Sequence, residues 1–130
     1  MSNLKLLAID LATNRRQLVT PSTGGGGAIK IPFAYGDASP ATLSTVPAGT
    51  TIFTAIIVMQ VPFNGVGSAL RLGDPAQSDR LFPAAQNDPT RSAEYETNPG
   101  YTYLAATPIL LTITPGAGCT QGAGFILLEV

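Results

Sequence analysis

Four charged residues lie within ten positions in a chain that carries few charges: Arg71, Asp74, Asp79 and Arg80. Two aspartates that converged in a cleft could act as acid and base in hydrolysis. Carboxylates together with loop carbonyl oxygens could instead hold a calcium ion. In a third interpretation Asp74 caps its own turn, while Asp79 and Arg80 form an ion pair or a subunit contact.

The rest of the composition favours the structural interpretation. The chain has no histidine, which removes the Ser-His-Asp and Cys-His arrangements and the usual zinc ligands. The aspartate spacing lacks the alternation and the glutamate of an EF-hand loop. Glu94 and Glu96 stand in a proline-rich segment and are expected to be solvated. We therefore expect no catalytic activity, no cofactor and no metal site.

Other residues with chemical potential are also better explained by packing. Cys119 is the single cysteine, so it has no partner for an intrachain disulfide. Tyr95, Tyr101 and Tyr103 could form a platform for sugars, but in a chain without tryptophan they are expected to pack in the core or at an interface. Arg71 should lie off the apolar face of Leu70 and Leu72, paired with a carboxylate of the corner or of a neighbouring subunit.

Low charge points to an assembly component. Of the 130 residues, 45% are hydrophobic and 12% are charged, against about 25% charged in a typical domain. Large uncharged surfaces usually mark interfaces. The net charge is −1 and no basic cluster exceeds Arg15-Arg16, so nucleic-acid binding is not expected. No apolar run is long enough to span a membrane, and the N-terminus does not fit a signal peptide.

The first part of the chain is predicted to be an arm. Apolar residues in 1–17 fit a helical stripe, but the segment suits an extended conformation almost as well. Four consecutive glycines, Gly24 to Gly27, then indicate a flexible linker. We predict an extended N-terminal arm and linker at residues 1–27 and a domain at 28–130. The residues expected to make the arm's contacts are Leu4, Leu7, Leu11, Arg15 and Arg16.

From Ala28 onward the pattern is that of an all-β domain. Ile29, Ile31 and Phe33 alternate with other residues, and Pro32 places this strand at a sheet edge. Residues 50–61 are apolar on both faces, which indicates a central strand. Further strands are predicted at 41–46, 69–73, 101–105, 109–114 and 122–130, with a possible short one near 92–96. This spacing predicts a jelly-roll-like antiparallel β-sandwich.

A series of motifs runs from about Thr50 to Val130. In order they are Phe63-Asn64-Gly65, Ala69-Leu70-Arg71-Leu72-Gly73-Asp74, Ser78-Asp79-Arg80-Leu81, Tyr101-Thr102-Tyr103, Leu111-Thr112-Ile113-Thr114-Pro115-Gly116 and Gly122 to Val130. This order of motifs resembles a family of small tailed-bacteriophage virion proteins that decorate or cement the capsid, or anchor fibres to it. Residues 1–49 are not matched.

The resemblance implies a β-sandwich, commonly trimeric, on the outside of a capsid shell. The expected partner is the major capsid protein, and the expected location is the virion surface after synthesis in the bacterial host cytoplasm. The arm would dock on the shell or on a neighbouring subunit. One alternative is a carbohydrate- or receptor-binding module of a phage tail or fibre. A small hydrolase that uses Asp74 and Asp79 is a second alternative.

Overall fold

The computed structural model describes residues 6–10, 15–18 and 27–130. Almost all regular structure in these residues is β-strand. The elements are β1 (Leu6–Asp10), β2 (Arg15–Leu18), β3 (Ala28–Ala34), β4 (Ala41–Val46), β5 (Thr50–Ile52), β6 (Thr54–Val61), β7 (Ala69–Gly73), a 3-10 turn η1 (Ala84–Gln86), β8 (Glu94–Thr97), β9 (Tyr101–Tyr103), β10 (Thr107–Thr114) and β11 (Ala123–Glu129). The predicted all-β class is therefore confirmed.

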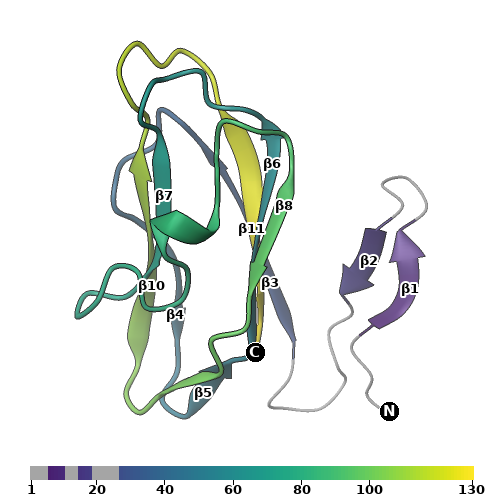
Figure 1. Cartoon of the computed structure of the whole chain (residues 1–130). Coiled ribbons are helices and arrows are strands. Elements are labelled where there is room, and N and C mark those ends of the chain that lie inside the picture. Colours follow the sequence, from purple (N-terminus) through teal and green to yellow (C-terminus); the bar gives the residue numbers. More distant parts are fainter. Residues whose placement is uncertain (1–5, 11–14, 19–26) are drawn as a thin grey trace.

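Two antiparallel sheets form a sandwich. One has the strand order β3-β11-β6-β8 and the other β4-β10-β7, and the two lie face to face in Figure 1. A short ribbon of β5 and β9 closes one end. The chain moves between the two sheets as it passes from β3 to β4, from β6 to β7 and from β10 to β11, which is the connectivity of a jelly roll. An isolated bridge between Leu72 and Phe82 continues the smaller sheet beyond β7.

The core lies between the sheets and follows from the two-residue period of the strands. Alternate residues of β6 and β11 face the smaller sheet, among them Ile57 and Ile126, both fully buried. They meet Leu70 and Leu111 from β7 and β10. This one cluster spans both sheets, which is what fixes the sandwich as a unit.

The structure confirms most of the strands predicted from the sequence and divides one of them. β3, with Pro32, is an edge strand, and the C-terminal strand β11 is paired on both sides, by β3 and β6. The predicted single strand over 50–61 is two strands, because the chain leaves the β5–β9 ribbon at Phe53 and enters the larger sheet. The short strand predicted near 92–96 is present as β8 (Glu94–Thr97), which forms the other edge of that sheet.

The N-terminal segment contains paired strands rather than a helix. β1 and β2 form an antiparallel hairpin in which Ile9 is opposite Arg16 and Asp10 is opposite Arg15. Within the described residues, these two strands pair with each other and with no strand of the sandwich. Residues 6–10 and 15–18 are therefore extended strands, where the alternative prediction for this segment was a helix. In the described part of the chain, no helix has the length and apolar character needed to cross a membrane.

Candidate functional site

The charged corner after β7 is built around the buried carboxylate of Asp74, which is 3% exposed. Its Oδ1 accepts hydrogen bonds from the backbone N–H groups of Ala76 and Gln77, each 2.9 Å long. This is the turn-capping geometry that aspartate provides to its own loop. Gly73 permits the tight turn, since a Cβ there would lie 2.2 Å from the carbonyl oxygen of Gln77.

The other oxygen of Asp74 joins the corner to a distant strand. Oδ2 accepts hydrogen bonds from Nε of Arg80 and from the hydroxyl of Tyr103 on β9, the latter at 2.9 Å. The guanidinium of Arg80 also lies over the ring of Tyr101, 4.5 Å from its centroid. The rings of Tyr101 and Tyr103 pack edge to face at 4.8 Å. These four residues, which we call the Asp74 network, tie the loop after β7 to β9.

The electrostatics of the Asp74 network favour a charged carboxylate. Burial alone would raise the pKa of Asp74, but hydrogen bonds from Arg80, Gln77, Tyr103 and Ala76 outweigh it and hold the pKa below its usual value. Burial, together with the bond to Asp74, raises the pKa of Tyr103, so its hydroxyl stays protonated and donates. The hydrogen bond to Asp74 raises the pKa of Arg80 in turn.

The structure brings together only some of the residues predicted for this corner. Asp74 and Arg80 form an ion pair, whereas Asp79 accepts a hydrogen bond from the side-chain amide of Gln77 at 3.2 Å. The ion pair expected between Asp79 and Arg80 is therefore corrected to one between Asp74 and Arg80, because the turn directs the guanidinium back toward the buried carboxylate. Arg71 lies on β7 opposite Thr112, off the buried face of Leu70 and Leu72.

This geometry makes Asp74 a structural group. Both of its oxygens already accept from donors, one of them a cation, and a calcium ion would have to displace that cation. The described residues contain no group of three or more histidine, cysteine or acidic side chains arranged to hold a metal ion. The sequence could not reveal the roles of Tyr101 and Tyr103 here, since they are distant in the chain and their contacts arise only from the fold.

The Asp74 network braces the β5–β9 end of the sandwich, where the neighbouring chain segments carry no charged side chains. The backbone of Tyr103 accepts a hydrogen bond from the N–H of Gly49, and the hydroxyls of Thr51 and Thr102 lie 2.7 Å apart across the β5–β9 ribbon. Directly after β9 comes Leu104, whose side chain is 88% exposed, and directly after β5 comes Phe53, 53% exposed. Residues 47–53 and 98–109 contain no charged side chain.

An open groove adjoins this end. Its volume is about 530 Å³, and its walls include Ile29, Val46, Thr50, Phe53 and Val130. No lining residue has a charged side chain. An exposed aromatic ring beside a groove without charged side chains is a surface suited to contact with another protein. Sequence reasoning missed this surface, although the absence of charge in the two loops was visible.

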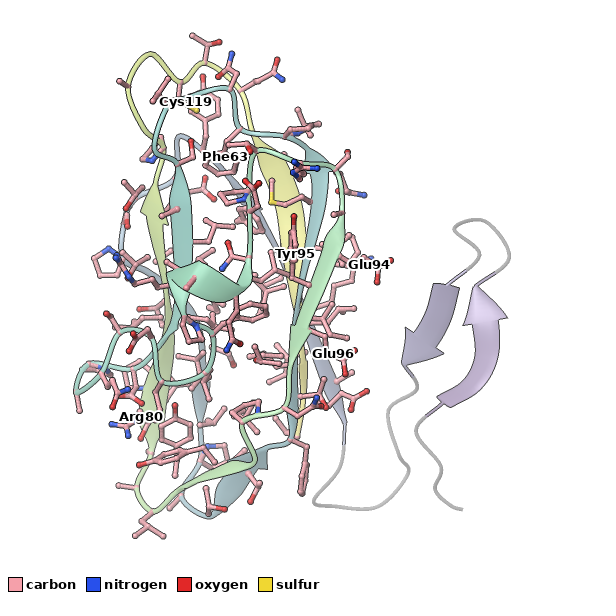
Figure 2. The ribbon with its side chains drawn as sticks, viewed as in Figure 1. Phe63, Arg80, Glu94, Tyr95, Glu96 and Cys119 are labelled. Atoms are coloured by element: carbon pink, nitrogen blue, oxygen red, sulfur yellow. The ribbon has the colours of Figure 1, made fainter. Side chains whose placement is uncertain are left out.

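The other predicted site residues are placed as follows. Glu94 and Glu96 are exposed on β8 and point away from the space between the sheets, whereas Tyr95 points into it (Figure 2). The hydroxyl of Tyr95 donates a hydrogen bond to the backbone carbonyl of Asp88. Tyr95 and Tyr101 are half-buried and Tyr103 is buried, so none of the three tyrosines considered as a sugar platform presents a fully exposed ring. Leu7 is in β1 and Arg15 and Arg16 are in β2. The predicted arm contacts Leu4 and Leu11 lie outside the described residues.

Comparison with known proteins gives one informative likeness. No protein-family model matches the chain, and no curated protein matches it. A chain in a solved structure described as "Cyanophage Pam1 capsid asymmetric unit" is similar, with a TM-score of 0.59 and 18% sequence identity. The likeness covers 87% of this chain and 91% of that one. At this identity it establishes that the two chains share a fold.

Proposed function

We propose that this chain is a structural virion protein that decorates the outside of a phage capsid and stabilises it by binding the major capsid protein. The observation that carries the proposal is the shared fold with a chain of a phage capsid structure over most of both chains. Jelly rolls are frequent in viral capsid proteins. The motif resemblance to phage decoration proteins between about Thr50 and Val130 supports the same role, and it does not depend on the fold comparison.

The surface of the molecule suits such a role. A decoration protein performs no catalysis and needs a rigid domain with uncharged contact surfaces. The Asp74 network makes the β5–β9 end rigid, and Leu104 and Phe53 are exposed there without charged neighbours in sequence. We propose this end as the surface that contacts the capsid shell. In this account the chain has no enzymatic activity, and it acts as a homotrimer whose repeated contacts add up to tight attachment.

The first test asks whether the chain is part of the particle. Virions purified from the phage that encodes it should contain it at a fixed ratio to the major capsid protein. Particles made without its gene should lose their DNA at a lower temperature than complete particles. A chain absent from purified virions, or particles equally heat-stable without it, would contradict the proposal.

The second test addresses the contact surface. Leu104→Asp and Phe53→Asp should each weaken binding to particles at least tenfold, since burying a carboxylate in an apolar contact costs more than about 1.4 kcal/mol. Val66→Asp is the matched control, because Val66 is also an exposed apolar residue but lies on a loop bridged to Ala117. A loss of binding with Val66→Asp and none with the other two would assign the contact elsewhere.

A further inference from the structure

The outer face of the four-stranded sheet carries a second hydrophobic cluster, separate from the core. It consists of Ile56 and Val58 on β6 and Leu127 on β11, with Phe125 packed against them. These side chains point away from the smaller sheet, because their neighbours Ile57 and Ile126 belong to the core. A sheet face that met only water would be expected to carry polar residues at these positions.

Strand register shows that the cluster is organised as two rows across the sheet. In one row Pro32, Phe125, Val58 and Glu94 are successive partners. In the other row Lys30, Leu127, Ile56 and Glu96 are successive partners. Each row therefore has an apolar centre and ends at a glutamate on β8. We call this surface the outer-sheet face.

The outer-sheet face is covered. Ile56 is 4% exposed, Val58 6% and Leu127 9%, values typical of a core. The smaller sheet lies against the opposite face, and the β5–β9 ribbon closes an end of the sandwich. Neither of these elements covers the outer-sheet face, which leaves the N-terminal segment as the part of the chain that could cover it. In Figure 1 the β1–β2 hairpin is drawn on the side of the four-stranded sheet that faces away from the smaller sheet.

Charge and chain length also favour the N-terminal segment as the part of the chain that covers the outer-sheet face. Residues 1–27 carry three cationic side chains and one anionic side chain, a net charge of +2, whereas residues 28–130 carry four and seven, a net charge of −3. Arg15 and Arg16 of β2 carry charges opposite in sign to those of Glu94 and Glu96 on β8. Residues 19–27 join β2 to β3, an edge strand of this sheet, and can span up to about 30 Å.

We propose that the N-terminal hairpin, residues 6–18, docks on the outer-sheet face of its own chain and shields the second hydrophobic cluster. Apolar residues of the hairpin cover the centre of the two rows, and the arginine of β2 that shares their face lies toward the β8 glutamates. The docking is a property of the free protein and does not rest on the proposed capsid role. Either conclusion can therefore fail without the other.

The test uses the full chain with a nitroxide label that broadens nearby methyl signals in NMR spectra. Cys119→Ser removes the native thiol, and Thr13→Cys places the label between β1 and β2. We expect strong broadening of the Ile56, Val58 and Leu127 methyl signals. The Ile109 and Leu111 methyls, on the smaller sheet, are the control and should broaden much less. Equal broadening of both groups, or none, would overturn the proposal.

Two further arms identify the contacts and the chain that supplies them. Glu94→Arg with Glu96→Arg should reduce the broadening severalfold, and adding Arg15→Glu with Arg16→Glu should restore it. Asp37→Arg, on the exposed β3–β4 turn, should leave it unchanged. Mixing isotope-labelled chains with nitroxide-labelled chains should give no broadening, because the docking is within one chain. Broadening of the Ile56, Val58 and Leu127 methyl signals in the mixture as strong as that within one labelled chain would show that a second copy supplies the hairpin and would overturn the assignment.

Discussion

At the scale of single residues, Asp74 is the group on which the loop after β7 depends. It caps its own turn, pairs with Arg80 and holds the hydroxyl of Tyr103. The sequence predicts the first of these roles, because the residues involved are neighbours in the chain. The contact with Tyr103 joins residues 29 positions apart and depends on how β7 and β9 are placed by the sandwich, which the local pattern does not reveal.

Replacing this carboxylate should therefore be costly. Asp74→Ala leaves the Tyr103 hydroxyl and two backbone N–H groups without their acceptor and should lower the free energy of unfolding by roughly 2–3 kcal/mol. Asp79→Asn, which changes a side chain outside the Asp74 network, should alter it by less than about 0.5 kcal/mol. Urea unfolding followed by circular dichroism measures both. Equal effects of the two substitutions would show that Asp74 has no special role.

The stabilisation should also depend on pH. Because the pKa of Asp74 is lower in the folded protein, its contribution is complete above the unfolded value, about 3.9, and is lost as the pH falls through the folded value. Stability should thus decrease from about pH 5 downward, and Asp74→Asn should flatten that decrease.

Hydrogen bonds from the side chain and backbone of Thr90 lower the pKa of Asp88. Protonation of Asp88 at low pH should therefore also reduce the stability of the folded protein. Asp88 is the more exposed of the two, so Asp88→Asn should flatten the decrease less. An acid profile that is identical in wild type and Asp74→Asn would contradict the assignment.

At the scale of elements, the sequence predicts strands well where one face is apolar and the other is not. Pro32 places β3 at the edge of its sheet, and the two-sided apolar character of β6 and β11 places these strands in its centre. The sequence predicts less well where one strand ends and the next begins. Phe53 interrupts an apolar run without a glycine or a proline, because the chain changes sheets there rather than turning.

One close approach between strands gives a specific prediction. A Cβ on Gly124 of β11 would lie 2.0 Å from the carbonyl oxygen of Val58, next to the irregularity where β6 and β11 change register. Gly124→Ala should therefore destabilise the domain by about 2–3 kcal/mol. Gly36→Ala, where a Cβ would meet nothing within 4 Å, is the control and should be neutral or slightly stabilising. Thermal unfolding of both variants checks this, and comparable melting temperatures would contradict it.

At the scale of the whole molecule, the low charge content has two different explanations. The β5–β9 end, whose chain segments carry no charged side chain, and its groove are proposed as a contact with the shell. The apolar outer-sheet face is proposed as the docking surface of the hairpin. Composition predicts that uncharged surface must be covered, but it does not say by what. The fold separates these surfaces by placing one at an end of the sandwich and the other on a sheet.

Removal of residues 1–27 should affect both surfaces in a recognisable way. The sandwich should remain folded, because its core is formed by residues of β3 to β11 and the loops between them. Binding of a hydrophobic dye should increase as the outer-sheet face is uncovered, and attachment to particles should weaken. An unfolded product would show that the N-terminal segment is part of the domain rather than an arm.

The most direct test of the account is rebinding to capsids that lack this protein. Purified full chain, first weighed by native mass spectrometry, is added to such capsids, and the particles are sedimented. We predict a trimer that binds to saturation at a fixed ratio to the major capsid protein and restores resistance to heat. A monomer that stays in the supernatant at every concentration would contradict the central claim.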